Sequence, residues 1–323
     1  MDSGLFADDI ARKPEVLSEL ADKLERDDPW HVLDRLLPDG VRRIVLIGMG
    51  SSRFAADVAA SRLRARGVAA SAEYASNAVL PSTDDATLIV LISATGGSKE
   101  TVAAAERLRG NGTLVALTNV RDSPIAKLSD AVVLMHAGVE RGGVACRTYQ
   151  HTLAMLLALT DHVCGASGSL VDDVRGAVTA TQHLLYSESE WLPRMTELLI
   201  GPAGTHIAAP ADRLSSALQS ALMLREGPRR GAIGCETGDW SHIDVYLTKT
   251  TDYRLLLYGG SSWEAELLDW TTQRGTTVVS VGQDLTSAAY SLRYPGDTDP
   301  TVALLSEVVV AELVAARLWQ ESG

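Results

Sequence analysis

Short apolar runs alternate with helical patterns along most of the chain. One run at 43–52, RIVLIGMGSS, ends at glycine and is followed by an alanine-rich helical stretch that reaches Gly67. The same order of strand, small-residue turn and helix recurs in ATLIVLISATGGSKETVAAAERLRGNG, and further strand candidates lie at 69–76, 113–119 and 131–138. Continuous apolar strands followed by helices imply a parallel sheet covered on both faces. The pattern predicts a doubly wound α/β domain whose binding site lies beyond the carboxyl ends of its strands.

A second copy of this pattern follows a long helical stretch at roughly 145–190. Residues 197–218 echo RIVLIGMGSSRFAADVAASRL, and residues 253–282 echo the strand, turn, helix and strand of the first copy. A repeat at this distance indicates two similar domains rather than a solenoid, whose period is about 20–50 residues. We therefore predict an α/β chain of two tandem doubly wound, parallel-sheet domains of flavodoxin type.

The boundary between these two domains is predicted within the helices near residue 180. The first domain is expected over 1–180 and the second over 181–323. Residues 6–26 have apolar positions at helical spacing and read as a helical lead-in to the first domain. Pro14 interrupts this pattern at a place suited to a first helical turn.

Composition and charge narrow the classes of partner. The 41 acidic and 29 basic side chains give a net charge of −12, which argues against nucleic acid or an anionic membrane surface as the main partner. The three cysteines, Cys146, Cys164 and Cys235, are odd in number and lack CxxC spacing. That pattern argues against a disulfide framework or a structural zinc site and favours a reducing compartment. With no signal peptide and no apolar run of about 18 residues, we expect a soluble cytoplasmic protein.

Two strand-to-helix turns are rich in glycine and hydroxyl groups. The turn SATGGS at 93–98 precedes a helix, and GMGSS at 48–52 precedes another. Unpaired N–H groups and the helix dipole make such a turn favourable for an anion, and glycine lets the main chain approach the ligand. Any single serine or threonine could instead be an N-cap, but five hydroxyls in two turns favour a phosphate monoester. The candidate ligands are Gly50, Ser51, Ser52, Ser93, Thr95 and Ser98.

A dinucleotide is the alternative occupant of the first turn. Gly48 and Gly50 supply two glycines of a GxGxxG motif, and Glu73 lies where an acid that binds ribose is expected. Arg53 stands at the third glycine position, where a side chain obstructs the packing of helix on strand. The sequence therefore favours a phosphate monoester over NAD. In the second copy, Trp263 directly follows the glycine turn, and we interpret that turn as degenerate for phosphate.

Three segments of the chain, IGMGSS, LISATGGSKET and SPIAKLSDAVVLMHAGVERGGVA, together resemble the sugar isomerase (SIS) family. The resemblance is greatest to the tandem isomerase half of glucosamine-6-phosphate synthase and extends from about residue 40 to 318. It implies that Ser93, Thr95 and Ser98, with Ser51 and Ser52, hold the phosphate of a sugar. It also implies that Val144 contacts the sugar through its main chain.

The same resemblance assigns the chemistry to the second half. ALQSALMLREG matches the helix that ends in the catalytic glutamate of the family, which falls on Glu226, and GDWSH places the ring-opening histidine at His242. Moving a proton between C1 and C2 of an open-chain sugar requires a carboxylate acting first as base and then as acid. Histidine, which titrates near neutrality, suits the opening of the cyclic form. Without the resemblance, Glu226 would read as an exposed charge at a helix end.

Several positions depart from the synthase. Asp2 stands where the glutaminase domain has its cysteine, and no such domain is present in this sequence. We therefore expect no glutamine-driven amide transfer by this chain unless a partner protein supplies the ammonia. Met223 replaces a lysine, Gln219 an acid and Ala94 a glutamine of the family pattern. These departures weaken the match to the synthase's own substrate, while Glu226 and His242 suffice for simpler reactions.

The predicted function is an enzyme that needs neither a metal nor an organic cofactor. It is a phosphosugar aldose–ketose isomerase, or an amino-sugar-phosphate deaminase or deglycase, acting at C1/C2 of a hexose 6-phosphate derivative. The GPRRG segment at 227–231 is either a simple turn or a clamp for a substrate carboxylate, which would favour an amino acid–sugar adduct. The resemblance also implies a homodimer, in which the histidine is contributed across the subunit interface.

The alternative is a non-catalytic phosphosugar sensor, as SIS domains are in some transcriptional regulators. Neither a helix-turn-helix segment nor a basic face is visible in the sequence. A sensor also has no need of the Glu226 and His242 pair.

Overall fold

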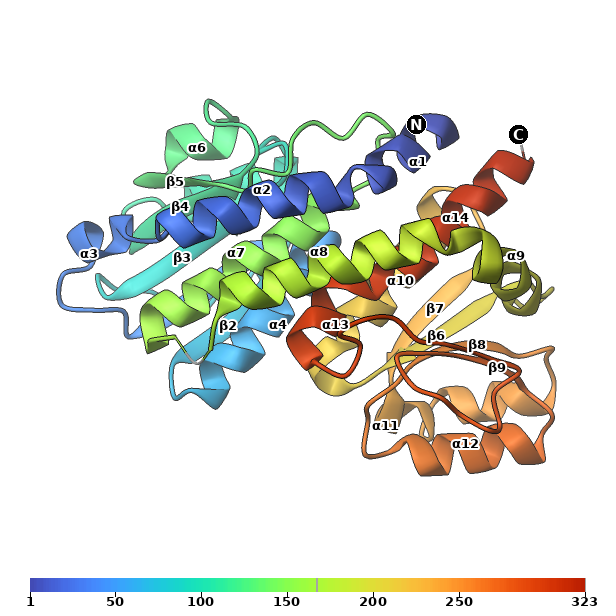
Figure 1. Cartoon of the computed structure of the whole chain (residues 1–323). Helices are drawn as coiled ribbons and strands as arrows, with labels where there is room; N and C mark the ends of the chain where they lie inside the picture. Colours follow the sequence, from blue (N-terminus) through green and yellow to red (C-terminus); the bar gives the residue numbers. More distant parts are fainter. Residues whose placement is uncertain (167, 323) are drawn as a thin grey trace. The chain divides into compact units, whose positions relative to one another are not determined.

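Two parallel five-stranded sheets organise the chain, whose computed structural model describes residues 1–166 and 168–322 (Figure 1). The first sheet has the order β2-β1-β3-β4-β5 and the second the order β10-β9-β8-β6-β7. Read from its other edge, the second sheet has its strands in the same order as the first. The predicted α/β class with two doubly wound parallel sheets is therefore confirmed, and the repeat seen in the sequence corresponds to a repeated topology.

The first sheet consists of strands that are buried on both faces. In β3 all six residues are buried, and in β1 only the first is exposed, which explains their continuous apolar sequence. Helix α5 packs its alanines against one face together with α6, while α4 contacts β1, β2 and α7. The elements are β1 (Arg43–Gly48), α4 (Ser51–Ala65), β2 (Ala69–Tyr74), β3 (Thr87–Ile92), α5 (Lys99–Leu108), β4 (Thr113–Thr118), α6 (Pro124–Leu128), β5 (Ala131–Leu134) and α7 (Arg147–Cys164).

The second sheet is covered in the same way. Alternate residues of its central strands face a large apolar cluster built with α8, α9, α10 and α14, and the others face a smaller cluster under α11 and α12. The elements are α8 (Leu170–Tyr186), α9 (Glu188–Leu199), β6 (Thr205–Ala209), η1 (Ala211–Arg213), α10 (Leu214–Glu226), β7 (Ala232–Glu236), α11 (Thr237–Trp240), η2 (Asp244–Lys249), β8 (Arg254–Tyr258), α12 (Glu264–Gln273), β9 (Thr277–Val281), β10 (Tyr290–Leu292), α13 (Pro300–Ser306) and α14 (Val308–Ser322).

Three helices precede the first strand: α1 (Ser3–Ala11), α2 (Lys13–Arg26) and α3 (Val32–Leu36). The helical pattern over 6–26 is divided at Arg12, whose N–H closes α1 on Asp8. Pro14 then lies in the first turn of α2, where its missing N–H has no helical partner to lose. None of the helices in the described ranges is both long enough and apolar enough to cross a membrane.

The chain divides into two compact units that do not follow a single boundary in the sequence. The first-sheet unit comprises 16–139 and 147–174, and the second-sheet unit comprises 1–15, 140–146 and 175–323. The predicted boundary near residue 180 falls within α8, and the division into domains 1–180 and 181–323 stays a prediction.

Buried polar contacts hold the N-terminal segment in the second-sheet unit. The ammonium of Lys13 lies 2.6 and 2.8 Å from the carboxylate oxygens of Glu312, and both side chains are almost fully buried. Helix α1 packs along α14, where the rings of Phe6 and Trp319 are 5.9 Å apart between centroids. A buried ion pair is costly to break from one side, because the remaining charge loses its partner.

Candidate functional site

The two hydroxyl-rich turns lie at the point where the strand order of the first sheet reverses. β1 and β3 are hydrogen-bonded neighbours, with Ile47 opposite Leu91, so the turns that follow them begin about 5 Å apart. Ligands of doubly wound sheets bind at such a reversal, outside the carboxyl ends of the strands. Gly50, Ser51 and Ser52 therefore lie at the same sheet edge as the 93–98 turn.

The 93–98 turn has the backbone form that an anion site requires. Gly96 has φ +64°, and the N–H of Gly97 donates to the Thr95 hydroxyl at 3.3 Å. Ser98 is the N-cap of α5: its hydroxyl accepts from the N–H of Thr101 at 3.4 Å and donates to the carboxylate of Glu100 at 2.9 Å. Ser98 thus has the capping role that is the alternative to phosphate binding, and its long bond to Thr101 leaves it able to exchange this partner for a ligand.

Contacts with the following strand and helix fix this turn in place. The carbonyl of Ala94 accepts from the N–H of Asn119 at 3.0 Å and from the hydroxyl of Thr118 at 3.1 Å. The carbonyl of Gly96 accepts from the N–H of Ile125 in α6 at 3.1 Å. Since the carbonyls of Ala94 and Gly96 are hydrogen-bonded to the following strand and helix, the conformation of the turn does not depend on a ligand.

The turn after β1 also depends on close packing. A Cβ atom on Gly48 would lie 2.8 Å from the Cβ of Ser52, and Gly50, at the N-terminal boundary of α4, has φ +50°. Arg53 forms an ion pair with Asp57, and its guanidinium lies 5.0 Å from the ring centre of Tyr74. Arg53 is thus engaged on α4 and at the β2 edge, at the position where a dinucleotide motif has glycine.

In the corresponding turn of the second sheet, the main-chain N–H groups bind a side-chain carboxylate. This turn follows β8 at the reversal between β6 and β8, and it borders a cavity of about 380 Å³. The carboxylate of the buried Glu264 accepts from the N–H groups of Gly260 and Ser261, the latter at 2.8 Å. A side-chain carboxylate thus occupies the donors that a phosphate would use, which gives a physical reason to regard this turn as degenerate for phosphate.

Glu264→Ala is expected to lower the free energy of unfolding by about 1–3 kcal/mol, because two main-chain donors lose a charged acceptor. Urea denaturation measures the loss. Inorganic phosphate should then stabilise the variant more than the parent protein. Glu266→Ala, at an exposed position of the same helix, is the matched control. Equal stability of the two variants would contradict this role of Glu264.

Glu226 ends α10 on the face that carries Gln219 and Met223, because these residues are spaced i, i+4 and i+7. The amide of Gln219 donates to the carbonyl of Ala145 at 2.9 Å, so this face is turned toward the 140–146 segment. Glu226 is half-buried, and within the described ranges no hydrogen bond or ion pair holds its carboxylate. Burial raises the pKa of Glu226 above its ordinary value, and Arg225 opposes this only in part.

The 140–146 segment, which carries Val144, is tied down along its length. The N–H of Gly142 donates to the carboxylate of Asp9 at 2.7 Å, and that of Cys146 donates to Glu140 at 2.7 Å. A Cβ atom on Gly142 would lie within 2.6 Å of the Phe6 main chain, so only glycine allows this approach. Val144 itself is buried in the large apolar cluster, with 2% of its surface exposed.

His242 is exposed and lies between α11 and η2. Its N–H donates to the carbonyl of Asp239 at 2.9 Å. The chain is anchored two residues to either side of His242, at Trp240 and Asp244. The indole N–H of Trp240 donates to the hydroxyl of Tyr253 at 2.9 Å, and this hydroxyl donates to the carboxylate of Asp244 at 2.9 Å. This buried network positions the turn that presents the His242 side chain.

Tyr253→Phe is expected to destabilise the protein by about 1–3 kcal/mol, because Trp240 and Asp244 both lose a buried partner. Thermal and urea unfolding would detect the change. Tyr246→Phe removes an exposed hydroxyl from the same segment and should be neutral. A neutral Tyr253→Phe would show that the network does not anchor this turn.

The GPRRG segment closes the end of α10. The N–H of Gly227 donates to the carbonyl of Met223 at 3.1 Å, and that of Arg230 donates to Leu224 at 2.9 Å. Arg229 has φ +57°, as is common just after a helix. This geometry explains the segment as a helix-ending turn, with both arginine side chains exposed to solvent.

The candidate residues fall into two groups, one in each unit. The first-sheet unit brings together Gly50, Ser51, Ser52, Ser93, Thr95 and Ser98, and the second-sheet unit contains Val144, Glu226 and His242. Asp9, Gln219, Asp244 and Tyr253 support these residues without having been identified as such from the sequence. In the sequence, Asp9 and Asp244 look like ordinary surface acids, since the partner of Asp9 lies 133 residues away and nothing in the pattern links Asp244 to Tyr253. The described residues contain no cluster of three His, Cys, Asp or Glu that could hold a metal ion.

The comparisons with known proteins agree with this architecture. The chain is 27% identical over 254 aligned residues to a glutamine–fructose-6-phosphate aminotransferase (isomerizing) of Halobacterium salinarum, covering 73% of this chain and 41% of that protein. The namesake of Aeropyrum pernix is 24% identical over 265 residues, covering 76% of this chain and 43% of that protein. The chain thus spans less than half the length of these curated relatives.

Solved structures share the fold of nearly the whole chain. The C-terminal domain of glucosamine-fructose-6-phosphate aminotransferase from Francisella tularensis superposes with a TM-score of 0.85 at 17% identity, covering 98% of this chain and 96% of that one. A tagatose-6-phosphate ketose/aldose isomerase from Escherichia coli gives 0.80 at 16% identity, covering 99% and 93%. A glucosamine-6-phosphate deaminase from Thermotoga maritima gives 0.71 at 17% identity, covering 99% and 95%.

The family match concerns the first sheet. Residues 40–161 match the sequence profile of the SIS domain, a range that contains β1 to β5 and both hydroxyl-rich turns. The second sheet has the same strand order, while its assignment as a second SIS domain stays a prediction. Residues 40–161 thus resemble an SIS domain, in a chain that is similar to glutamine–fructose-6-phosphate aminotransferases.

Proposed function

We propose that this protein acts on a phosphorylated sugar, transferring a proton between C1 and C2 of a hexose 6-phosphate derivative. The reaction is an aldose–ketose isomerisation, or the deamination or deglycation of an amino-sugar phosphate. Glu226 is the proton-transfer residue and His242 opens the ring. The phosphate is held by Gly50, Ser51, Ser52, Ser93, Thr95 and Ser98, and the main chain of Val144 contacts the sugar.

The half-buried Glu226 carboxylate, which no described residue holds, carries this proposal. A structural carboxylate in such surroundings would be expected to have an ion-pair or hydrogen-bond partner. A group that must take a proton from carbon and return it needs a raised pKa and freedom from a competing partner. Its place on the α10 face directed at the 140–146 segment supports a role beside Val144.

The neutral turns at the edge of the first sheet support a phosphate anchor. They offer hydroxyls and glycine main chain at the N-termini of α4 and α5, with no cation among the six proposed residues. The phosphate lies at the unreactive end of the substrate, so its binding energy can be used to orient C1 and C2. The SIS match over 40–161 is consistent with this role.

The exposure of His242 is compatible with a site completed by a second copy of the chain. A histidine that opens a sugar ring must reach the ring oxygen, and the anchored turn presents His242 outward. We propose a homodimer in which this residue reaches the ligand of the partner subunit. Analytical sedimentation of the parent protein and of the His242→Asn variant would measure the oligomeric state, and a separate assay would measure turnover.

The choice among the three reactions is proposed to depend on the substrate's C1 or C2 substituent. Two relatives by fold have names that include a ketose/aldose isomerase and a glucosamine-6-phosphate deaminase. In this chain Gln219 and Met223 share a face of α10 with Glu226. At these two positions the synthase that the sequence resembles has an acid and a lysine. A less charged face favours simple isomerisation, deamination or deglycation over amide transfer.

Proton exchange in deuterated water tests the proposal most directly. The purified protein is incubated with hexose 6-phosphates, amino-sugar 6-phosphates and fructosyl-amino-acid phosphates, and deuterium at C1 and C2 is followed by NMR. Incorporation into one class, with its products, identifies the reaction. Binding of a phosphosugar without exchange in any class would favour the sensor function instead, and absence of binding would contradict both.

A further inference from the structure

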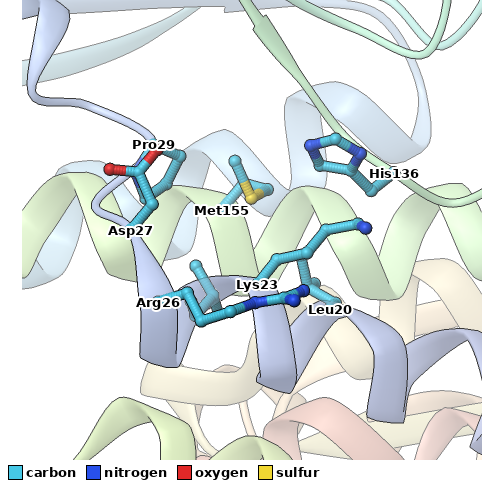
Figure 2. Close-up of a pocket in the computed structure, with 8 residues that line it drawn as sticks. Leu20, Lys23, Arg26, Asp27, Pro29, His136 and Met155 are labelled. Atoms are coloured by element: carbon cyan, nitrogen blue, oxygen red, sulfur yellow. The ribbon is translucent and has the colours of Figure 1, made fainter.

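A cavity of the first-sheet unit lies apart from the hydroxyl-rich turns. It has a volume of about 310 Å³ and opens between α2, the middle of α7 and the residues that follow β5 (Figure 2). Its floor is apolar and almost fully buried at Leu20 and Met155. Lys23 and His136 project into it from different elements, and Arg26, Asp27 and Pro29 form the opposite rim. None of the six phosphate residues proposed above lines this cavity.

Positive groups gather at one end of the cavity without a compensating acid. Among the described residues, the Lys23 ammonium and the His136 ring have no hydrogen bond or ion pair, and Arg121 beside them has none either. Lys23 and Arg121 are close enough to His136 to lower its pKa, together with the larger effect of burial. The Lys23 ammonium and the Arg121 guanidinium make this end of the cavity positive and disfavour the imidazolium form of His136, and a bound anion would offset both effects.

The backbone of His136 has a strained, left-handed conformation. Its φ is +57°, a left-handed value that a residue other than glycine adopts at an energetic cost. Both neighbours are fixed: the Met135 carbonyl lies 2.9 Å from the His151 ring, and the Ala137 carbonyl accepts from Arg147 at 3.1 Å. Strain maintained by contacts on both sides is typical of positions at which a side chain serves a site.

The remaining charged groups of the cavity are engaged elsewhere. The carboxylate of Asp27 lies 3.7 Å from the His31 ring, and the guanidinium of Arg26 donates to the Asp22 carbonyl at 2.9 Å. Figure 2 shows Asp27 at the far side of the pocket from His136. The end of the cavity at Lys23 therefore keeps its positive character.

We propose that this cavity binds a small organic anion, with its phosphate or carboxylate group between Lys23 and His136 and its apolar body against Leu20 and Met155. The site is separate from the proposed substrate site. His136 follows β5, which is two strands from β3, so it lies about 10 Å along the sheet edge from the 93–98 turn. An anion bound here would act as a second ligand of the SIS domain and leave the phosphate turns free.

Phenyl phosphate, which joins an apolar ring to a phosphate, is a suitable probe. The pKa of His136 is measured by NMR titration of its ring protons in the full-length protein, with the resonance assigned from its loss in His136→Gln. Phenyl phosphate is expected to raise this pKa by about one pH unit, because a bound dianion favours the imidazolium form. Lys23→Gln should lower the affinity at least 10-fold, whereas the charge-matched control Arg109→Gln should not. The melting temperature of each variant verifies that it is folded.

Two further sets of measurements distinguish the chemical group that is bound and the site at which it binds. Benzoate in place of phenyl phosphate tests whether a carboxylate suffices, and inorganic phosphate tests the contribution of the apolar body. Ser98→Ala, at the substrate-phosphate turn, should leave the His136 response unchanged. The proposal is overturned if His136 does not respond to any probe, if Lys23→Gln responds like the parent protein, or if the response disappears in Ser98→Ala. Failure of the exchange assay described above would leave these outcomes unaffected, since they do not depend on catalysis.

Discussion

Glu226→Gln is expected to slow proton exchange at C1 and C2 by about 10²- to 10⁴-fold, the range that a positioned acid–base group contributes. Phosphosugar affinity should change little, because the residues proposed to hold the phosphate belong to the first-sheet unit. Glutamine keeps the size of the side chain but cannot take up a proton from carbon. Deuterium incorporation measured at saturating substrate, together with calorimetric binding, separates the two effects. Exchange that survives the substitution would exclude Glu226 as the base.

The pH dependence of the parent enzyme provides an independent measurement. The base must be ionised to abstract a proton, and burial raises its pKa. kcat/KM is therefore expected to fall as the pH decreases through a value above that of an ordinary glutamate. The same burial disfavours the charged form in the folded state, so Glu226→Gln should not reduce stability at neutral pH. Glu266→Gln, at an exposed position, is the control for removal of one charge.

Gly96→Ala should have the largest effect on the phosphate turn. A Cβ atom at this position would lie 2.1 Å from the Ser123 hydroxyl and 2.3 Å from its Cβ, and the φ of +64° is unfavourable for alanine. The left-handed backbone costs roughly 1–2 kcal/mol and overpacking roughly 1–3, so a loss of about 2–5 kcal/mol in unfolding free energy is expected. Because the turn must shift to relieve the clash, phosphosugar affinity should fall as well. Urea denaturation and calorimetry measure both effects.

Gly97→Ala is the matched control for this change. At that position the nearest atom to an added Cβ is 3.8 Å away, and the backbone is not left-handed. In the double variant Gly96→Ala with Ser123→Gly, the steric part of the cost should be recovered and the backbone part should remain. Equal stability of Gly96→Ala and Gly97→Ala would show that the turn yields easily and is not organised in advance.

The repeated sheet could be predicted from the sequence because its signal is local. Strands such as β1 and β3 are buried on both faces, so their sequences are continuous apolar runs, and glycine marks the turn after each. The order of strand, turn and helix then limits the topology to few possibilities. The helix break at Arg12 is less visible, because the residues on both sides of it keep helical spacing.

The supporting residues of the site could not be predicted in the same way. The pairing of Gln219 with Ala145 joins positions 74 residues apart, and neither it nor the pairing of Asp244 with Tyr253 leaves a periodic pattern in the sequence. Glu264 appears in the sequence as one acid at the start of a helix, and only its contact with the turn after β8 gives it a role. Glu226 and His242 were singled out by resemblance, and their catalytic roles stay proposals.

The ion pair between Lys13 and Glu312 bears on how the chain can be divided in the laboratory. A fragment beginning at residue 175 would contain the whole second sheet but would leave Glu312 in an apolar interior without its cation. It would also lack Phe6 and Ile10, which fill the same interior. Such a fragment is an incomplete folding unit. A synthetic peptide of residues 1–15, added separately, would supply the missing Lys13, Phe6 and Ile10.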